Sequence, residues 1–155
     1  MLTEDVVQRL DDERFLLMAY SGQCLCGDIQ FQYDGPLGPV VLCHCKQCQR
    51  AHGSAFSASA PAQAIHMQWL TGVDQLKEYA SSPGKYRGFC GRCGSQLYSR
   101  VDAIPAILRL RVGALEKPLG KGAAQHVYVA AQSDWFQITD SLPQFDKTER
   151  TNDPH

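Results

Sequence analysis

The stretch Cys43-His44-Cys45-Lys46-Gln47-Cys48 places three cysteines within six residues of a 155-residue chain. Cys24-Leu25-Cys26-Gly27 precedes this stretch, and Cys90-Gly91-Arg92-Cys93-Gly94 follows it. Together the three motifs hold all seven cysteines of the chain. Cysteines placed at random would leave some standing alone, so the clustering predicts sites at which several thiols act together.

The first and third motifs each supply a pair of thiols with the spacing of a metal site. Zinc prefers four ligands in a tetrahedron, with sulfur at about 2.3 Å. A tight turn between paired cysteines favours a following residue with positive φ, and glycine stands there at Gly27 and Gly94. The sequence therefore predicts one closed, structural zinc site, whose four ligands are Cys24, Cys26, Cys90 and Cys93.

The middle motif supplies three thiols, those of Cys43, Cys45 and Cys48. Three protein ligands with one open position are the pattern of a catalytic or substrate-binding zinc. We therefore expect a second zinc site here. The spacing leaves open a single structural zinc with the other cysteines inert. A thioredoxin-like redox role for Cys90 and Cys93 is disfavoured, because no βαβ pattern surrounds them.

The chain from Ala19 onward consists of short β-like runs separated by turns rich in Gly and Pro. Between these runs, only 48–53 resembles a helical turn. Strands spaced by roughly 10–15 residues with little helix between them predict a mainly β, antiparallel domain. The expected strands are 29–33, 54–61, 75–81, 85–90, 96–101, 106–112 and 126–131.

The length of the chain fits about one domain. We expect a domain over 19–146, preceded by an extension over 1–18 and followed by a polar tail over 147–155. Within the extension, 4–18 is compatible with a short helix that Thr3 would cap.

Charge and hydropathy exclude several classes of partner. Fifteen Lys and Arg stand against sixteen Asp and Glu, and this balance argues against nucleic acid or an anionic membrane surface as partner. No apolar run reaches the roughly 20 residues that a membrane-spanning helix needs. The first fifteen residues lack the apolar core of a secretory signal, so we expect a cytoplasmic protein, in which disulfides are rare.

The motifs in this order resemble the glutathione-dependent formaldehyde-activating enzyme family, whose domain also occurs in centromere protein V. The resemblance runs from about Tyr20 to Phe145 and includes the late segment Trp135-Phe136-x-Ile138-x-Asp140-x-Leu142-Pro143. It implies an Mss4-like fold, with the structural zinc on the paired cysteines and the catalytic zinc on the triplet. One departure is Gln49, at the position where many members place an arginine. The matching motifs are Gly22-x-Cys24-x-Cys26-Gly27, Cys43-His44-Cys45-x-x-Cys48 with Arg50-x-His52-Gly53, and Phe89-Cys90-x-x-Cys93-Gly94-Ser95.

The resemblance implies a carbon–sulfur lyase that joins glutathione and formaldehyde into S-hydroxymethylglutathione. We expect the substrates to be a glutathione-like thiol and a small aldehyde, or their S-hydroxyalkyl adduct. A thiol that enters the open position of the second site would lose its proton and could attack a carbonyl carbon. Such chemistry needs a proton donor, and the candidates are His44, Arg50 and His52.

Other residues have weaker assignments. The basic side chains that could attract a glutathione-like dianion, or simply lie in solvent, are Lys46, Arg50, Arg87 and Arg92. Trp135 and Phe136 would either line the mouth of a pocket or anchor the core. His66 and His126 have no visible partner, so no role is assigned to them.

Three other functions compete with the lyase. A non-catalytic, zinc-stabilised binding module would close the second site with a fourth protein ligand, whereas an enzyme would leave that position open. A methionine-sulfoxide reductase of the B type needs a reactive cysteine apart from the zinc ligands, and no cysteine follows Cys93. A nucleic-acid-binding zinc ribbon is disfavoured by the charge balance.

Overall fold

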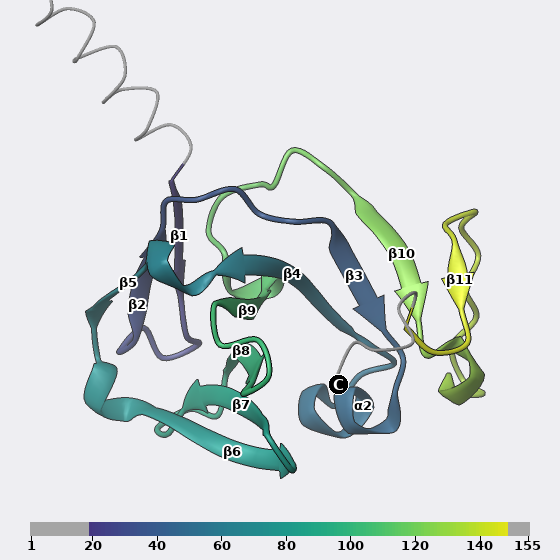
Figure 1. Ribbon diagram of the computed structural model, residues 1–155, viewed down its shortest axis with the longest axis horizontal. Coiled ribbons are helices and arrows are strands. Elements are labelled where there is room, and N and C mark those ends of the chain that lie inside the picture. Colours follow the sequence, from purple (N-terminus) through teal and green to yellow (C-terminus); the bar gives the residue numbers. More distant parts are fainter. Residues whose placement is uncertain (1–18, 149–155) are drawn as a thin grey trace, which may run out of the picture.

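The computed structural model describes residues 19–148 as two β-sheets and one short α-helix (Figure 1). The small sheet has the order β1-β2-β5, and the large sheet has the order β11-β10-β3-β4-β9-β8-β7-β6. No helix within 19–148 is both long and apolar enough to cross a membrane. The strands of the small sheet are β1 (Tyr20–Gln23), β2 (Gln30–Tyr33) and β5 (Met67–Thr71). Those of the large sheet are β3 (Val40–Cys43), β4 (Ser57–Gln63), β6 (Leu76–Ser82), β7 (Lys85–Cys90), β8 (Gln96–Val101), β9 (Ile107–Arg111), β10 (Ala123–Val127) and β11 (Gln144–Phe145).

Short helical segments join some of these strands. The helix α2 (Lys46–His52) follows β3 directly and lies beside the end of that strand (Figure 1). Its last turn ends at Gly53, whose φ of 55° is in the left-handed region that glycine adopts easily. Four single turns of 3-10 helix complete the connections, namely η1 (Ala64–His66), η2 (Val73–Gln75), η3 (Val112–Ala114) and η4 (Val129–Ala131).

The two sheets share an apolar core. Phe31 and Tyr33 of β2 pack in one buried cluster with Tyr98 of β8 and with Leu108 and Leu110 of β9. Because side chains alternate between the faces of a strand, the intervening residues of β9 point to the opposite face of the large sheet. That opposite face is polar, and it carries the pocket that Cys43 and Cys48 line.

The expected mainly β fold is confirmed. The strands expected over 85–90 and 96–101 have these bounds in the structure, and the helical turn expected over 48–53 is α2. The extension over 1–18 and most of the tail lie outside the described residues, so the structure does not test the helix expected over 4–18.

Three features differ from the sequence-based expectation. The strand expected over 126–131 ends at Val127, because Tyr128 has a left-handed φ of 58° and a 3-10 turn follows it. The large sheet is mixed, since β10 pairs in parallel with both β3 and β11. The sequence also gave no indication of β1, β3, β5 and β11.

Candidate metal centre

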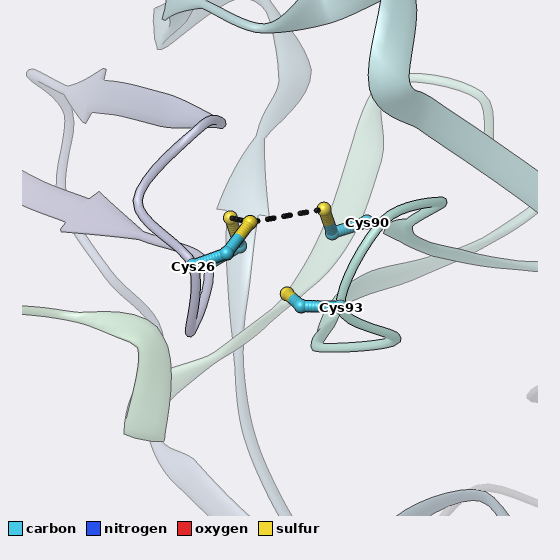
Figure 2. A group of neighbouring side chains, drawn as sticks. Cys26, Cys90 and Cys93 are labelled. Carbon is cyan, nitrogen blue, oxygen red and sulfur yellow. Dashed lines mark hydrogen bonds between the residues drawn. The ribbon is translucent and has the colours of Figure 1, made fainter.

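The four cysteines of the outer motifs converge on one point between the two sheets. Cys24 and Cys26 lie in the loop after β1, Cys90 ends β7, and Cys93 lies in the following turn. Their four Sγ atoms all lie within 4.8 Å of one another. Figure 2 shows the Cys26 side chain pointing across to Cys90 and Cys93.

The spacing of these sulfur atoms fits a tetrahedral metal site. The Sγ of Cys26 lies 3.5 Å from that of Cys24 and 3.8 Å from that of Cys90. Four sulfur atoms at 2.3 Å from a central zinc would be separated by about 3.8 Å. The backbone N–H of Ile29 also donates to Cys24 Sγ at 3.3 Å, as is typical of a thiolate ligand. We call Cys24, Cys26, Cys90 and Cys93 the quartet.

Glycines shape both turns that carry the quartet. Gly27 and Gly94 have φ values of 79° and 77°, in the region that a side chain would strain. The N–H of Gly94 donates to the carbonyl of Cys90 at 2.8 Å, and the N–H of Gly27 donates to that of Cys24 at 3.1 Å. These bonds close the turns and point the paired thiols in one direction, as the sequence predicts.

The middle motif forms a second group, which we call the triplet. Cys43 ends β3, Cys45 caps the start of α2, and Cys48 lies in the first turn of that helix. Their Sγ atoms lie within 4.8 Å of one another, and no other His, Cys, Asp or Glu of residues 19–148 joins them. The local fold brings them together because the Cys45 side chain accepts a hydrogen bond from the N–H of Cys48 at 3.4 Å.

Arg87 of β7 stands beside the triplet. Its two terminal nitrogens lie 4.0 and 3.9 Å from Cys48 Sγ, and the residue is only 4 % exposed. Contacts with Cys43 and Cys45 lower the pKa of the Cys48 thiol, and the nearby charge of Arg87 lowers it further. The contacts of Cys43 with Cys45 and Cys48 raise the pKa of the Cys43 thiol. The triplet therefore favours a thiolate at Cys48.

The triplet opens into a cavity of about 320 Å³ on the polar face of the large sheet. Cys43 and Cys48 form part of its wall. We call this cavity the triplet pocket. Its remaining described lining residues are Pro39, Val41, Ser57, Ser59, Pro61, Lys85, Ser99, Arg109, Arg111, Gln125, Val127 and Thr148.

A larger and more open hollow of about 770 Å³ lies next to the triplet pocket. Ser57 and Arg111 line both spaces, so the two adjoin at these residues. His52 lines the larger hollow, and its Nε2 atom is buried without a partner among the described residues. Burial and the nearby charge of Arg111 lower the pKa of His52 to about 4, so its ring is neutral at pH 7.

His44 lies between two cysteines of the triplet, but its ring lines neither space. Its Nε2 atom lies 2.8 Å from Nδ1 of His126, and Nε2 of His126 lies 3.0 Å from a carboxylate oxygen of Asp140. Both imidazole rings are fully buried. The sequence assigned no partner to His126, because its partners are distant in the chain.

The remaining candidates lie elsewhere. Arg50 is exposed on α2 and lines neither space, and Lys46 is exposed and donates to Gln49. Arg92 forms a 2.7 Å ion pair with Asp28, close to the quartet. Of the four basic candidates, only Arg87 contacts the triplet.

The two late aromatic residues have different surroundings. Trp135 is 69 % exposed, so it belongs neither to the core nor to the wall of either space. The Phe136 ring packs 6.1 Å from the His44 ring and 5.4 Å from that of Phe56. Phe136 is thus an anchor beside the triplet loop.

Sequence reasoning missed Lys85 and Arg111, both of which line the triplet pocket. The available signal was the alternation of basic residues in β7 and β9, which places them on one face of the sheet. Alternating polar residues usually face solvent, and this pattern alone does not reveal that these are buried.

Comparisons with known proteins agree with this geometry. The family model described as "Glutathione-dependent formaldehyde-activating enzyme" matches residues 19–131. An uncharacterized lyase of Schizosaccharomyces pombe is 32% identical over 79 residues, which cover 51% of this chain and 56% of that relative. A crystal structure of a Rhodobacter sphaeroides protein matches with a TM-score of 0.54 at 21% identity, over 63% of this chain and 89% of that chain, and supports the fold. The chain belongs to the glutathione-dependent formaldehyde-activating enzyme family.

Proposed function

We propose that this protein is a zinc-dependent carbon–sulfur lyase, which joins a glutathione-like thiol to a small aldehyde or releases the two from their S-hydroxyalkyl adduct. The observation that carries the proposal is the convergence of three thiols, of which those of Cys43 and Cys48 line the triplet pocket. Family membership and the lyase name of the Schizosaccharomyces pombe relative support the same reaction class.

The two cysteine groups differ in the number of ligands that they offer. The quartet completes a tetrahedron by itself, which is the pattern of a structural site. The triplet offers three sulfur atoms, and no fourth donor of the common ligand types joins them in the described part of the chain. This difference favours an open site, and therefore an enzyme, over a binding module with two closed sites.

The chain's own residues prepare the triplet pocket for thiol chemistry. A zinc ion held by Cys43, Cys45 and Cys48 would supply a cation that favours the deprotonated form of an incoming thiol. Arg87 adds a fixed positive charge beside Cys48. Cys48 and Arg87 are each only 4 % exposed, so water screens the interaction between them weakly.

The reaction forms a single carbon–sulfur bond. The sulfur of the thiol donates an electron pair to the carbonyl carbon, and the proton of the thiol ends on the carbonyl oxygen. Neither His44 nor His52 lines the triplet pocket, so the arrangement does not favour either ring as the direct carrier of this proton. The reverse reaction moves the same proton back to sulfur.

The variant Cys45→Ser tests the proposal, with Cys93→Ser of the quartet as the matched control. We expect the zinc-loaded protein to consume glutathione and formaldehyde together. Cys45→Ser should lose this activity and one zinc per chain but keep the denaturant midpoint within a small shift. Cys93→Ser should lower that midpoint strongly, because the quartet joins the two sheets. Full activity in Cys45→Ser, or unfolding of that variant, would contradict a catalytic triplet.

A further inference from the structure

Lys85, the first residue of β7, is the buried lysine of the triplet pocket. It is only 5 % exposed, whereas the other five lysines of the chain are exposed. Lysine is almost never buried to this extent unless a negative group pairs with it. Among residues 19–148, no group accepts a hydrogen bond from Lys85 Nζ or forms an ion pair with it. The exposed Lys121, by contrast, donates to two backbone carbonyls.

The surroundings of Lys85 favour the uncharged form of its amine. Of the described residues that line the triplet pocket, none is Asp or Glu. Burial and the charges of Arg87 and Arg109 lower the pKa of Lys85. The charges of Cys48 and Cys45 act in the opposite direction, but they offset this lowering only in part. An uncharged lysine amine has a free electron pair and is a nucleophile.

The Lys85 amine shares its pocket with the triplet. Lys85, Cys43 and Cys48 all line the same cavity of about 320 Å³. An aldehyde bonded to the amine and a thiol beside Cys48 would therefore lie together in this cavity. Arg109 and Arg111 also line it, but a guanidinium group stays protonated in proteins and has no free electron pair to donate. Lys85 is thus the one amine among the described residues of the pocket wall.

We propose that Lys85 is a catalytic nucleophile, which holds the aldehyde as a Schiff base while the thiol attacks it. Desolvation or a neighbouring cation activates the lysines that form Schiff bases in enzymes, and Lys85 has both. The thiol step of this inference rests on the proposed function, but capture of the aldehyde by Lys85 does not. The Schiff base also supplies an activated carbon to a pocket whose described wall contains no histidine.

The steps balance without an oxidant or a reductant. The Lys85 nitrogen donates its electron pair to the carbonyl carbon, and the carbonyl oxygen leaves as water, which takes up the proton of the thiol. A protonated imine remains on Lys85. The thiolate sulfur then donates an electron pair to the imine carbon, so a carbon–sulfur bond forms and the carbon–nitrogen double bond becomes single. Water finally replaces the amine at this carbon, which releases the S-hydroxyalkyl product and restores the neutral Lys85 amine.

Reductive trapping on the full zinc-loaded chain tests the Schiff base directly. The probe is formaldehyde with a borane reductant, whose hydride converts an imine into an N-methyl amine, and peptide mass spectrometry locates the methyl group. We expect Lys85 to be methylated at least about tenfold faster than the exposed Lys117, because binding in a pocket raises the local concentration of the aldehyde at the amine. Methylation of Lys85 that is no faster than that of Lys117 would overturn the proposal.

Lys85→Arg is the decisive variant, because arginine keeps the positive charge but has no nucleophilic amine. We expect Lys85→Arg and Lys85→Met to lower turnover of glutathione and formaldehyde equally, by at least about tenfold, and to keep the zinc content of the unmodified protein. Lys117→Met is the matched control, since Lys117 is exposed and lies outside the triplet pocket, and it should keep full turnover. Full turnover in Lys85→Arg would show that Lys85 supplies only a charge, and would overturn the proposal. If neither Lys85 variant folds, trapping on the unmodified chain decides alone.

The same measurements separate this inference from the proposed function. Rapid methylation of Lys85 without turnover of glutathione and formaldehyde would reject the lyase and retain Lys85 as a covalent aldehyde site. Turnover that Lys85→Arg leaves intact would retain the lyase and reject the Schiff base.

Discussion

His44 and His126, which are 82 residues apart in the chain, form a buried hydrogen bond, and Asp140 determines which of the two rings donates it. The carboxylate of Asp140 can only accept a hydrogen bond, so the Nε2 atom of His126 carries the proton and donates to it. Nδ1 of His126 is then the acceptor, and Nε2–H of His44 donates to it. The half-exposed Asp140 thereby orients the residue between Cys43 and Cys45.

Replacement of His126 by Phe should destabilise the fold and loosen the triplet. The Nε2–H group of His44 would stay buried without an acceptor, which costs roughly 1–3 kcal/mol of unfolding free energy. Denaturant unfolding of the zinc-loaded protein measures this loss, and zinc retention against a chelator measures the effect on the triplet. Asp140→Asn should have a smaller effect in the same direction, whereas Asp134→Asn, at an exposed position, should have none. Unfolding free energy equal to that of the unmodified protein would show that the histidine contact is incidental.

His52 should remain neutral well below physiological pH. Its pKa is lowered to about 4 in the folded chain, and that of an unfolded histidine is about 6.5. Between these two pKa values His52 is protonated in the unfolded chain but not in the folded chain. The free energy of unfolding should therefore fall as the pH drops from about 6.5 toward 4. Nuclear magnetic resonance titration of the ring checks the pKa. His52→Gln should flatten this part of the pH profile, and a ring that titrates near 6.5 would contradict the burial described here.

Gly88 leaves room for the ring of Tyr98. Glu78, Gly88 and Tyr98 lie in register on β6, β7 and β8, and the Tyr98 hydroxyl crosses β7 to donate to Glu78 at 2.8 Å. A Cβ on Gly88 would lie 2.3 Å from ring atoms of Tyr98. Because this ring is buried in the core, Gly88→Ala should destabilise the protein by roughly 1–3 kcal/mol. Gly122→Ala is the control, since its Cβ would meet nothing within 4 Å, and equal thermal midpoints for the two variants would refute the clash.

The sequence predicted the two cysteine pairs and the triplet because each is formed by residues that are close together in the chain. A glycine follows both the C-x-C pair of Cys24 and Cys26 and the C-x-x-C pair of Cys90 and Cys93, and Gly27 and Gly94 adopt the positive φ that such turns need. The strand over 85–90 could be predicted for a similar reason, because a turn signal marks its start and a cysteine motif marks its end. Local signals of this kind do not depend on distant partners.

The rest depends on contacts between distant parts of the chain. The strand β11 has only two residues and exists because β10 supplies its partner in parallel, a pairing that no local pattern encodes. Asp140 finds His126 only when that edge of the sheet forms. The burial of Lys85 and Arg111 likewise follows from assembly of the pocket, since their alternation along the chain is the same as that of a solvent-facing strand.

Zinc-edge X-ray absorption of the fully loaded protein tests the central proposal most directly, because it counts sulfur neighbours per zinc. Without added thiol, a closed quartet and an open triplet predict an average between three and four sulfur ligands. Addition of glutathione should raise this average to four, and Cys45→Ser should abolish the increase. An average that does not change when glutathione is added would contradict an open triplet site.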